Sequence, residues 1–173
     1  KVETVLMRYD YGNVICVSSE VGCSMGCAFC ASGILAKTRN LTAAEMVGEV
    51  VLMNQILAEE GENVTHIVVM GTGEPFDNYD NTMDFVRIMN EQKGLAIGAR
   101  HITVSTCALV EGIRKYANEG IQINLAISLH APNDEIRTQI MPIARKYNMD
   151  DLLDAVKYYV ETAGRRVTFE YIM

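Results

Sequence analysis

The chain has 173 residues, of which 49% are hydrophobic and 21% charged, and its formal net charge is −7. These values are typical of one globular domain, residues 1–173, and no apolar run reaches the roughly 18 residues of a transmembrane helix, so no membrane partner is expected. Nucleic-acid-binding domains are usually basic, so the acidic charge taken alone argues against an RNA or DNA partner, or places the binding surface elsewhere.

The predicted elements begin with a β-hairpin and continue as helices that alternate with short apolar strands. Residues 3–10 and 14–19 have the pattern of two strands joined by a tight turn over 11–13. A capping box formed by Thr42 and Glu45 predicts the start of the first helix. The helices are expected at 41–61, 79–94, 108–120 and 149–164, and the later strands at 66–70, 101–105, 123–129 and 166–172.

This alternation predicts an α/β fold with a parallel sheet. The strand at 14–19 and the four later strands make five parallel strands, too few for a closed eight-stranded barrel. Because parallel strands are normally covered by helices on both faces and the sequence stops on a strand at Met173, we expect a barrel cut after its fifth parallel strand. Chemistry in such folds takes place at the carboxyl ends of the strands, where the motifs below are located.

Three of the five cysteines, Cys23, Cys27 and Cys30, follow the first parallel strand with the spacing C-x3-C-x2-C. An odd and clustered set of cysteines favours a metal or redox role over a disulfide framework. A structural zinc site would need a fourth ligand, which only Cys107 or a histidine could supply. A four-iron cluster held by three thiolates leaves one iron open for a substrate or cofactor, and the spacing favours this interpretation.

The sequence stretches CVSSEVGCSMGCAFCASG, GTGEPFDN, VSTC and AISLHAPNDEIR together resemble the radical S-adenosylmethionine (SAM) superfamily, and within it the RlmN group of RNA adenine methyltransferases. The resemblance extends from Glu3 to Met173, nearly the whole chain. It implies a partial (β/α)6-type radical SAM barrel with an N-terminal β-hairpin, truncated after the fifth parallel strand. It also implies that residues 1–173 are a fragment, without the N-terminal accessory domain and the C-terminal part of the family.

The resemblance implies two cofactors, a [4Fe–4S] cluster held by the three cysteines and SAM bound at the open iron. The residues that match the family's SAM contacts follow three consecutive strands and are Gly73, Glu74, Ser105, Ser128, Leu129 and His130. Without the resemblance, the same residues have simpler interpretations: a tight turn at GTGE, a helix cap at Ser105 and a core histidine at His130.

Two further residues match catalytic residues of the family. Glu3 matches a proton acceptor, and Cys16 matches a cysteine that releases the RNA by forming a disulfide with a methyl-carrying cysteine. That methyl-carrying cysteine has no match in this chain, so the fragment is expected to be inactive for full turnover. The simpler alternatives are an exposed strand glutamate for Glu3 and a small buried hydrophobic residue for Cys16.

The resemblance implies that the whole enzyme methylates carbon 2 of adenosine in 23S rRNA and tRNA, with flavodoxin or ferredoxin as electron donor, and that it is a monomer. The first residues, KVETVLMRYD, lack the pattern of a signal peptide, so we expect a cytoplasmic protein. One alternative is a Cfr-type enzyme that methylates carbon 8 of the same rRNA base, although the proline of GEPFDN favours the RlmN type. Another is a zinc-binding module without catalysis.

Overall fold

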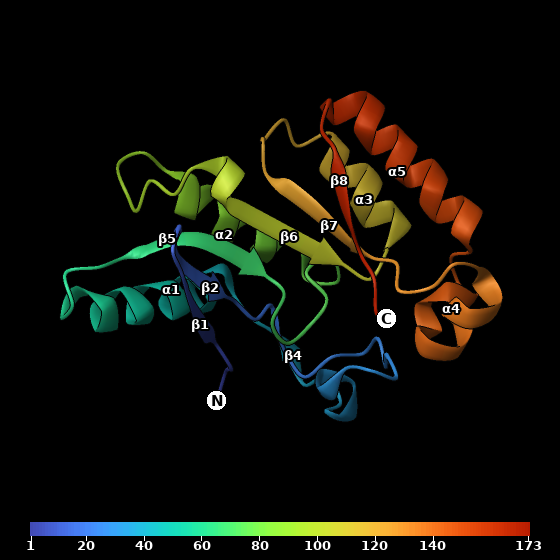
Figure 1. The fold of residues 1–173 in the computed structure, drawn as a ribbon, viewed down its shortest axis with the longest axis horizontal. Coiled ribbons are helices and arrows are strands. Elements are labelled where there is room, and N and C mark those ends of the chain that lie inside the picture. The colour runs from blue at the N-terminus through green and yellow to red at the C-terminus, as the bar shows by residue number, and fades with distance from the viewer.

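A six-stranded sheet forms the centre of the fold in the computed structural model, which describes residues 1–173 (Figure 1). The strand order is β1-β2-β5-β6-β7-β8. These strands are β1 (Val5–Tyr9), β2 (Gly12–Cys16), β5 (Val64–Val69), β6 (Ile102–Thr106), β7 (Asn124–Ser128) and β8 (Val167–Glu170). β1 and β2 form an antiparallel hairpin, and every later pair of neighbours is parallel. The predicted α/β fold with five parallel strands and an N-terminal hairpin is therefore confirmed.

Five α-helices connect the strands, and capping residues set their ends. They are α1 (Ala43–Ala58), α2 (Tyr79–Asn90), α3 (Val110–Ala117), α4 (Asp134–Ile140) and α5 (Met149–Ala163). The predicted capping box is confirmed, because the side chains of Thr42 and Glu45 each accept a hydrogen bond from the other residue's backbone. α5 stops at Gly164, whose left-handed backbone (φ 63°) ends the helical path.

The helices are shorter than the sequence pattern predicts, most clearly at α2 and α3. α2 ends at Asn90 rather than at residue 94, since the backbone N–H of Gly94 donates to the carbonyl of Glu91 (2.9 Å) in a separate turn. α3 begins at Val110 rather than at residue 108, because Ala108 has a φ of 83°, outside the helical region. Local turns therefore override the apolar periodicity at these two ends.

A two-stranded sheet that the sequence does not predict closes the base of the cysteine loop, which comprises residues 22–38. β3 (Glu20–Val21) pairs antiparallel with β4 (Arg39–Asn40). One step further into the loop, the backbone N–H of Cys23 donates to the carbonyl of Leu35 at 3.0 Å. Strands of two residues have no periodicity from which they could be predicted. The small sheet therefore holds the two ends of the cysteine loop side by side.

The hydrophobic core lies between the sheet and the helices. Its fully buried members include Ile15, Met46, Ile67, Phe85, Val104, Ile113 and Leu152. Figure 1 shows the cysteine loop and α4 on the side toward which the arrows of β5 and β6 point. Burial of the apolar surface fixes the strands and thereby the residues at their carboxyl ends. No helix is long and apolar enough to span a bilayer.

α1 carries a buried carboxyl group. The residue Glu49 is only 8% exposed, and its Oε2 accepts hydrogen bonds from the backbone N–H of Ser18 (3.1 Å) and from the hydroxyl of Thr4. Burial raises the pKa of Glu49 to about 7, while the two hydrogen bonds act in the opposite direction. The carboxyl group therefore changes its charge close to neutral pH.

We predict that this carboxyl group makes the protein less stable as the pH rises from 4.5 to about 7. In this window the folded protein still binds the Glu49 proton, whereas the unfolded chain has released it. The free energy of unfolding should fall by about 3 kcal/mol across the window. Glu49→Gln, which cannot titrate, should remove most of this decline, and the exposed Glu59→Gln should not. Denaturant unfolding at the two pH limits of this window measures the fall in the free energy of unfolding. An unchanged decline in Glu49→Gln would contradict the prediction.

Candidate active site

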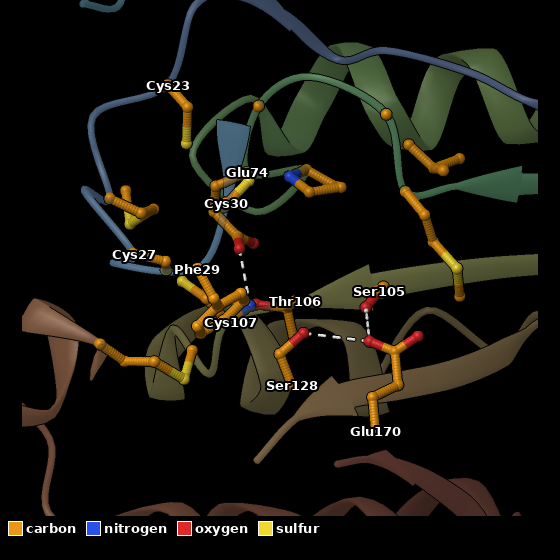
Figure 2. A pocket seen from close by; sticks show the side chains of 17 residues that line it. Cys23, Cys27, Phe29, Cys30, Glu74, Ser105, Thr106, Cys107, Ser128 and Glu170 are labelled. Atoms are coloured by element: carbon orange, nitrogen blue, oxygen red, sulfur yellow. Dashed lines mark hydrogen bonds between the residues drawn. The ribbon is translucent and has the colours of Figure 1, made fainter. Parts of the chain in front are cut away.

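A cavity of about 250 Å³ lies at the carboxyl ends of the parallel strands (Figure 2). The cysteine loop bounds it on one side, and residues at the ends of β5, β6, β7 and β8 bound it on the others. Among the predicted site residues, those that line the cavity are Cys23, Cys27, Cys30, Gly73, Glu74, Ser105 and Ser128. Those outside the lining are Glu3, Cys16, Leu129 and His130.

The cysteine loop presents three free thiols to this cavity. Cys23, Cys27 and Cys30 are each partly exposed, and none forms a disulfide. The left-handed backbone at Gly22 (φ 77°) and Gly26 (φ 64°) lets the loop turn around the space beside the sulfur atoms. The loop therefore brings the three thiols to one cavity although they are spread along it.

Polar contacts fix the cysteine loop at two further places. The backbone N–H of Ala28 donates to the carbonyl of Ile140 at the end of α4, at 2.8 Å. Nζ of Lys37 lies 2.6 Å from a carboxylate oxygen of Glu20 and 2.6 Å from one of Asp77. These contacts tie the loop to α4, to β3 and to the segment before α2, so the thiols are held in place by the rest of the fold.

The three cysteines fit a four-iron cluster better than a single metal ion. No three His, Cys, Asp or Glu side chains of the structure are placed to hold one ion together. A four-iron cube does not need such convergence, because each thiolate binds a different iron. A closed zinc site would need four ligands around one point. The cavity continues from the cysteines to Ser105 and Ser128, which leaves room for a further ligand beside the thiols.

Burial is the main cause that keeps the thiols of Cys23 and Cys27 protonated in the absence of a metal. Burial is the largest cause that raises the pKa of Cys27 to about 11, and the charges of Cys23 and Cys30 add to it. Burial likewise raises the pKa of Cys23. Iron must therefore displace protons when it binds, as is general for thiolate ligands.

The segment GTGE, which follows β5, passes very close to the backbone after β2. A Cβ atom added at Gly71 would lie 2.7 Å from Oγ of Ser18. One added at Gly73, whose φ is 113°, would lie 2.6 Å from Cβ of Glu20. Side chains cannot be accommodated at these distances, so both positions require glycine. The glycines let the loop form the wall of the cavity next to the cysteines.

Glu74 has its carboxylate oxygens fixed by backbone groups of two different loops. It is 3% exposed, and its Oε1 accepts from the N–H of Phe76 at 2.9 Å. Its Oε2 accepts from the N–H of Cys107 at 2.7 Å (Figure 2). Burial raises the pKa of Glu74, and both backbone hydrogen bonds act against this. Each oxygen retains a second lone pair, so Glu74 both joins the β5 and β6 loops and can accept a hydrogen bond from a ligand.

We predict that Gly73→Ala destabilises the protein more than Gly120→Ala does. Both glycines have a positive φ, but a Cβ at Gly120 meets no atom within 4 Å, whereas one at Gly73 collides with Glu20. Overpacking should add about 1–3 kcal/mol to the backbone strain that both substitutions share. Urea unfolding of the two variants measures the difference. Equal losses of stability would show that the close approach of the GTGE segment is not energetically important.

Glu170, the last residue of β8, joins the two predicted serines. Its Oε2 accepts hydrogen bonds from the hydroxyls of Ser105 (2.9 Å) and Ser128 (3.0 Å), and all three side chains line the cavity (Figure 2). From the sequence, Glu170 is expected only as part of a strand. The sequence nevertheless holds a signal for this role. Glu170 is a carboxylate near the carboxyl end of a predicted strand, just as Glu74 is a carboxylate shortly after β5. The three residues form a polar wall opposite the thiols.

Leu129 and His130 contact the same strand end through their backbones. Their N–H groups donate to the carbonyl of Glu170 at 3.1 and 3.2 Å. His130 has a φ of 56°, and its ring packs edge-on against Phe29 of the cysteine loop with the ring centroids 4.7 Å apart. Burial lowers the pKa of His130. The structure thus gives His130 a packing role against the loop, and its predicted contact with SAM stays a prediction.

Cys16 and Glu3 lie just outside the cavity, at the carboxyl end of β2. Cys16 is the last residue of β2, and Met70, which hydrogen-bonds to it through its backbone, lines the cavity. Burial is the largest cause that raises the pKa of Cys16, and the charges of Glu49 and Glu3 contribute. Glu3 is exposed, and its carbonyl accepts from the hydroxyl of Ser18 at 2.6 Å. Cys16 therefore lies beside the cavity wall, and the hydrogen bond from Ser18 holds Glu3 near the same end of β2.

A buried arginine, which the sequence did not indicate, fixes the ends of β6 and β7. Arg137 of α4 is fully buried and donates to the carbonyls of Cys107 (3.0 Å), Leu129 (3.3 Å) and Ser128 (3.4 Å). Arginines on helices are usually exposed, so no pattern predicts this one. Cys107 itself is buried and also lines the cavity.

The fold and the three-cysteine cavity define a class of protein. The sequence profile described as the Radical SAM superfamily matches residues 17–173, so the chain belongs to that superfamily. A solved radical SAM methyltransferase from Sphaerobacter thermophilus superposes with a TM-score of 0.96 at 51% identity, covering 99% of this chain and 50% of that one. The partial barrel predicted from the sequence is confirmed by this structural similarity.

Individual relatives narrow the similarity to one group. A protein of Spiroplasma citri named probable dual-specificity RNA methyltransferase RlmN is 60% identical over 173 residues, which are 100% of this chain and 50% of the relative. A Streptococcus sanguinis protein of the same name is 58% identical, over 99% of this chain and 48% of its own length. The chain thus spans about half the length of these relatives, and the predicted resemblance to the RlmN group is confirmed.

Proposed function

We propose that this chain is the catalytic core of an RlmN-type methyltransferase, which methylates carbon 2 of adenosine in 23S rRNA and in tRNA. The observation that supports this most is the placement of Cys16 and Glu3 at the end of β2, beside the cavity that the three cysteines line. The relatives' names describe RNA methyltransferases of dual specificity. Because the chain spans about half their length, the activity is proposed for the whole protein.

The cavity walls offer the groups that the two proposed cofactors need. The three thiols of the cysteine loop would hold the [4Fe–4S] cluster, and Glu74, Ser105 and Ser128 offer a carboxylate and hydroxyls to the polar groups of SAM. When bound, the pair supplies a 5′-deoxyadenosyl radical, which can activate a methyl group that acids and bases cannot. The chain orients the cofactors and excludes water, for which the apolar ring of Phe29 in the lining is suited.

Glu3 and Cys16 would act after the new carbon–carbon bond has formed. Carbon 2 of adenine is electron-poor, so the methyl group is first carried on a cysteine of the whole protein. We assign to Glu3 the removal of the proton from carbon 2; together with the loss of the adduct's unpaired electron, which the oxidised cluster would take up, this restores the aromatic ring. Cys16 then forms a disulfide with the carrier cysteine. The electron pair of the broken carbon–sulfur bond stays on the carbon, which takes up a proton and becomes the methyl group.

The remaining parts of the proposal concern the partners. The carrier cysteine has no counterpart among Cys16, Cys107 and the three loop cysteines, so this chain alone should not complete a turnover. Contacts to RNA phosphates need basic residues, whereas this chain has a net charge of −7. We therefore assign the phosphate contacts to other parts of the whole protein. We further propose a monomeric, cytoplasmic enzyme that receives electrons from flavodoxin or ferredoxin.

Mass spectrometry of RNA from cells that lack the full-length gene tests this function. We expect 2-methyladenosine to disappear from 23S rRNA and tRNA, and to return when the gene is restored, but not when it carries Cys27→Ala. Loss of 8-methyladenosine instead would identify a Cfr-type enzyme. Unchanged RNA together with stoichiometric zinc in the purified protein would identify a zinc-binding module.

A further inference from the structure

The β-hairpin ends before it reaches Glu3. The last pair of residues in the register of β1 and β2 is Val5 with Cys16, so Glu3 and Thr4 lie beyond the ladder. The hydrogen bonds that hold them are one from the hydroxyl of Ser18 to the carbonyl of Glu3 (2.6 Å) and one from the hydroxyl of Thr4 to Glu49. The position of Glu3 relative to Cys16 therefore depends on side chains and not on strand pairing.

Ser18 and Glu49 form the centre of this connection and are both buried. Ser18 is 0% exposed and Glu49 is 8% exposed. The backbone N–H of Ser18 donates to Oε2 of Glu49 at 3.1 Å, and the same oxygen accepts from Thr4. Oγ of Ser18 also accepts from the N–H of Thr72, at 3.0 Å, in the GTGE segment. One network thus connects the segment of Glu3, the chain after Cys16 and the cavity wall.

The fold needs an acceptor at this point, because the buried backbone N–H of Ser18 donates to Glu49, but it does not need a charged one. Glu49 lies on α1 between the buried apolar residues Met46 and Val50, where an uncharged side chain would pack without loss of solvation. Its Oε1 is buried and has no hydrogen-bond partner, which makes the group still more costly. A buried, incompletely satisfied carboxylate at a functional edge is therefore better explained by what it positions than by stability.

We propose that Glu49, acting through Thr4 and Ser18, is a positioning residue that holds Glu3 near Cys16 at the end of β2. The inference rests on the proposed function, because it concerns the two residues assigned to proton removal and RNA release. It assigns to Glu49 no contact with substrate or cofactor. Loss of the network would let the segment with Glu3 move away from the end of β2, while the cysteine loop would keep its own anchors.

The test compares Glu49→Leu, Glu49→Gln and Thr4→Val in the whole protein, loaded with cluster and SAM. Glutamine keeps an acceptor oxygen, whereas leucine removes it, and Thr4→Val removes one hydrogen bond at nearly unchanged shape. We expect Glu49→Leu to lower kcat for RNA methylation by about 100-fold with KM for RNA unchanged, since small displacements of catalytic groups have effects of this size. Glu49→Gln should stay within about threefold of the unsubstituted protein, and Thr4→Val should lie between them.

A second readout separates positioning from general damage. The iron content and the SAM affinity should be unchanged in all three variants, while in Glu49→Leu the isotope effect on kcat, measured with RNA deuterated at carbon 2 of the target adenosine, should rise as proton removal becomes rate-limiting. If Glu49→Leu does not fold, Thr4→Val decides the question alone. Normal kcat in Thr4→Val, or an equal fall of kcat, iron and SAM affinity in the folded variants, would overturn the inference. Absence of methylation by the unsubstituted protein would instead overturn the proposed function.

Discussion

Replacing Cys27 by alanine is expected to reduce bound iron from about four atoms per chain to well below one after anaerobic reconstitution with iron and sulfide. Three thiols line the cavity, so two remain in the variant, and water would have access to two of the irons. The brown colour of iron–sulfur charge transfer should be lost with the iron. In the whole protein, RNA methylation should fall below detection. Cys23→Ala and Cys30→Ala should behave in the same way.

The matched control is Cys107→Ala. Cys107 lines the same cavity, but it is 8% exposed and belongs to the β6 end and not to the cysteine loop. Its removal should leave the iron content unchanged. If Cys107→Ala lost its iron as Cys27→Ala does, Cys107 would be a fourth ligand, and no iron would remain open for SAM. Full iron content in Cys27→Ala would show that the loop cysteines do not hold the cluster.

Cys16→Ala is expected to arrest the whole protein with the RNA covalently attached. Methyl activation and addition to the base need only the cavity and the carrier cysteine, and neither involves Cys16 in the proposed mechanism. Without the second thiol no disulfide can form, so the carbon–sulfur bond to the RNA persists. We expect at most one methyl group transferred per enzyme and a protein–RNA species in denaturing gels that nuclease treatment shortens.

The position of Cys16 in the structure explains why its replacement by alanine should affect the release of RNA and not the binding of the cofactors. Cys16 lies outside the cavity lining, so its loss should leave iron content and SAM binding intact. Cys107→Ala again serves as the control, and it should release its RNA. Multiple turnovers by Cys16→Ala, with no covalent species, would remove Cys16 from the mechanism and leave it as a half-buried residue of β2.

Much of this arrangement could be predicted from the sequence, because regular elements and close spacing leave local signals. Apolar strands alternating with helices gave five parallel strands, and glycines with thiols at short spacing gave the loop at the edge. The positions of Glu74, Ser105 and Ser128 in one cavity follow from the same rule, since parallel strands end at one edge. The order of the strands in the large sheet could be predicted from one rule, namely that strands consecutive in the sequence are neighbours in the sheet.

Long-range polar contacts could not be predicted in this way. Glu170 meets Ser105 across 65 positions of sequence, and Glu49 meets Ser18 across 31. Arg137 resembles any helical arginine until the fold buries it under the ends of β6 and β7. The burial of a particular carboxylate or guanidinium depends on the complete tertiary structure, so no periodic pattern in the sequence predicts it. These residues complete the site around the ones that the motifs identify.

Electron paramagnetic resonance of the reconstituted, reduced chain, recorded with and without SAM, tests the central claim most directly. In the proposed site an iron without a protein ligand would bind SAM, so addition of SAM should change the signal of the reduced [4Fe–4S] cluster, and Glu74→Gln should weaken the affinity with which it does so. A cluster whose signal ignores saturating SAM would contradict the account. A colourless protein that takes up one zinc and no iron would contradict it as well.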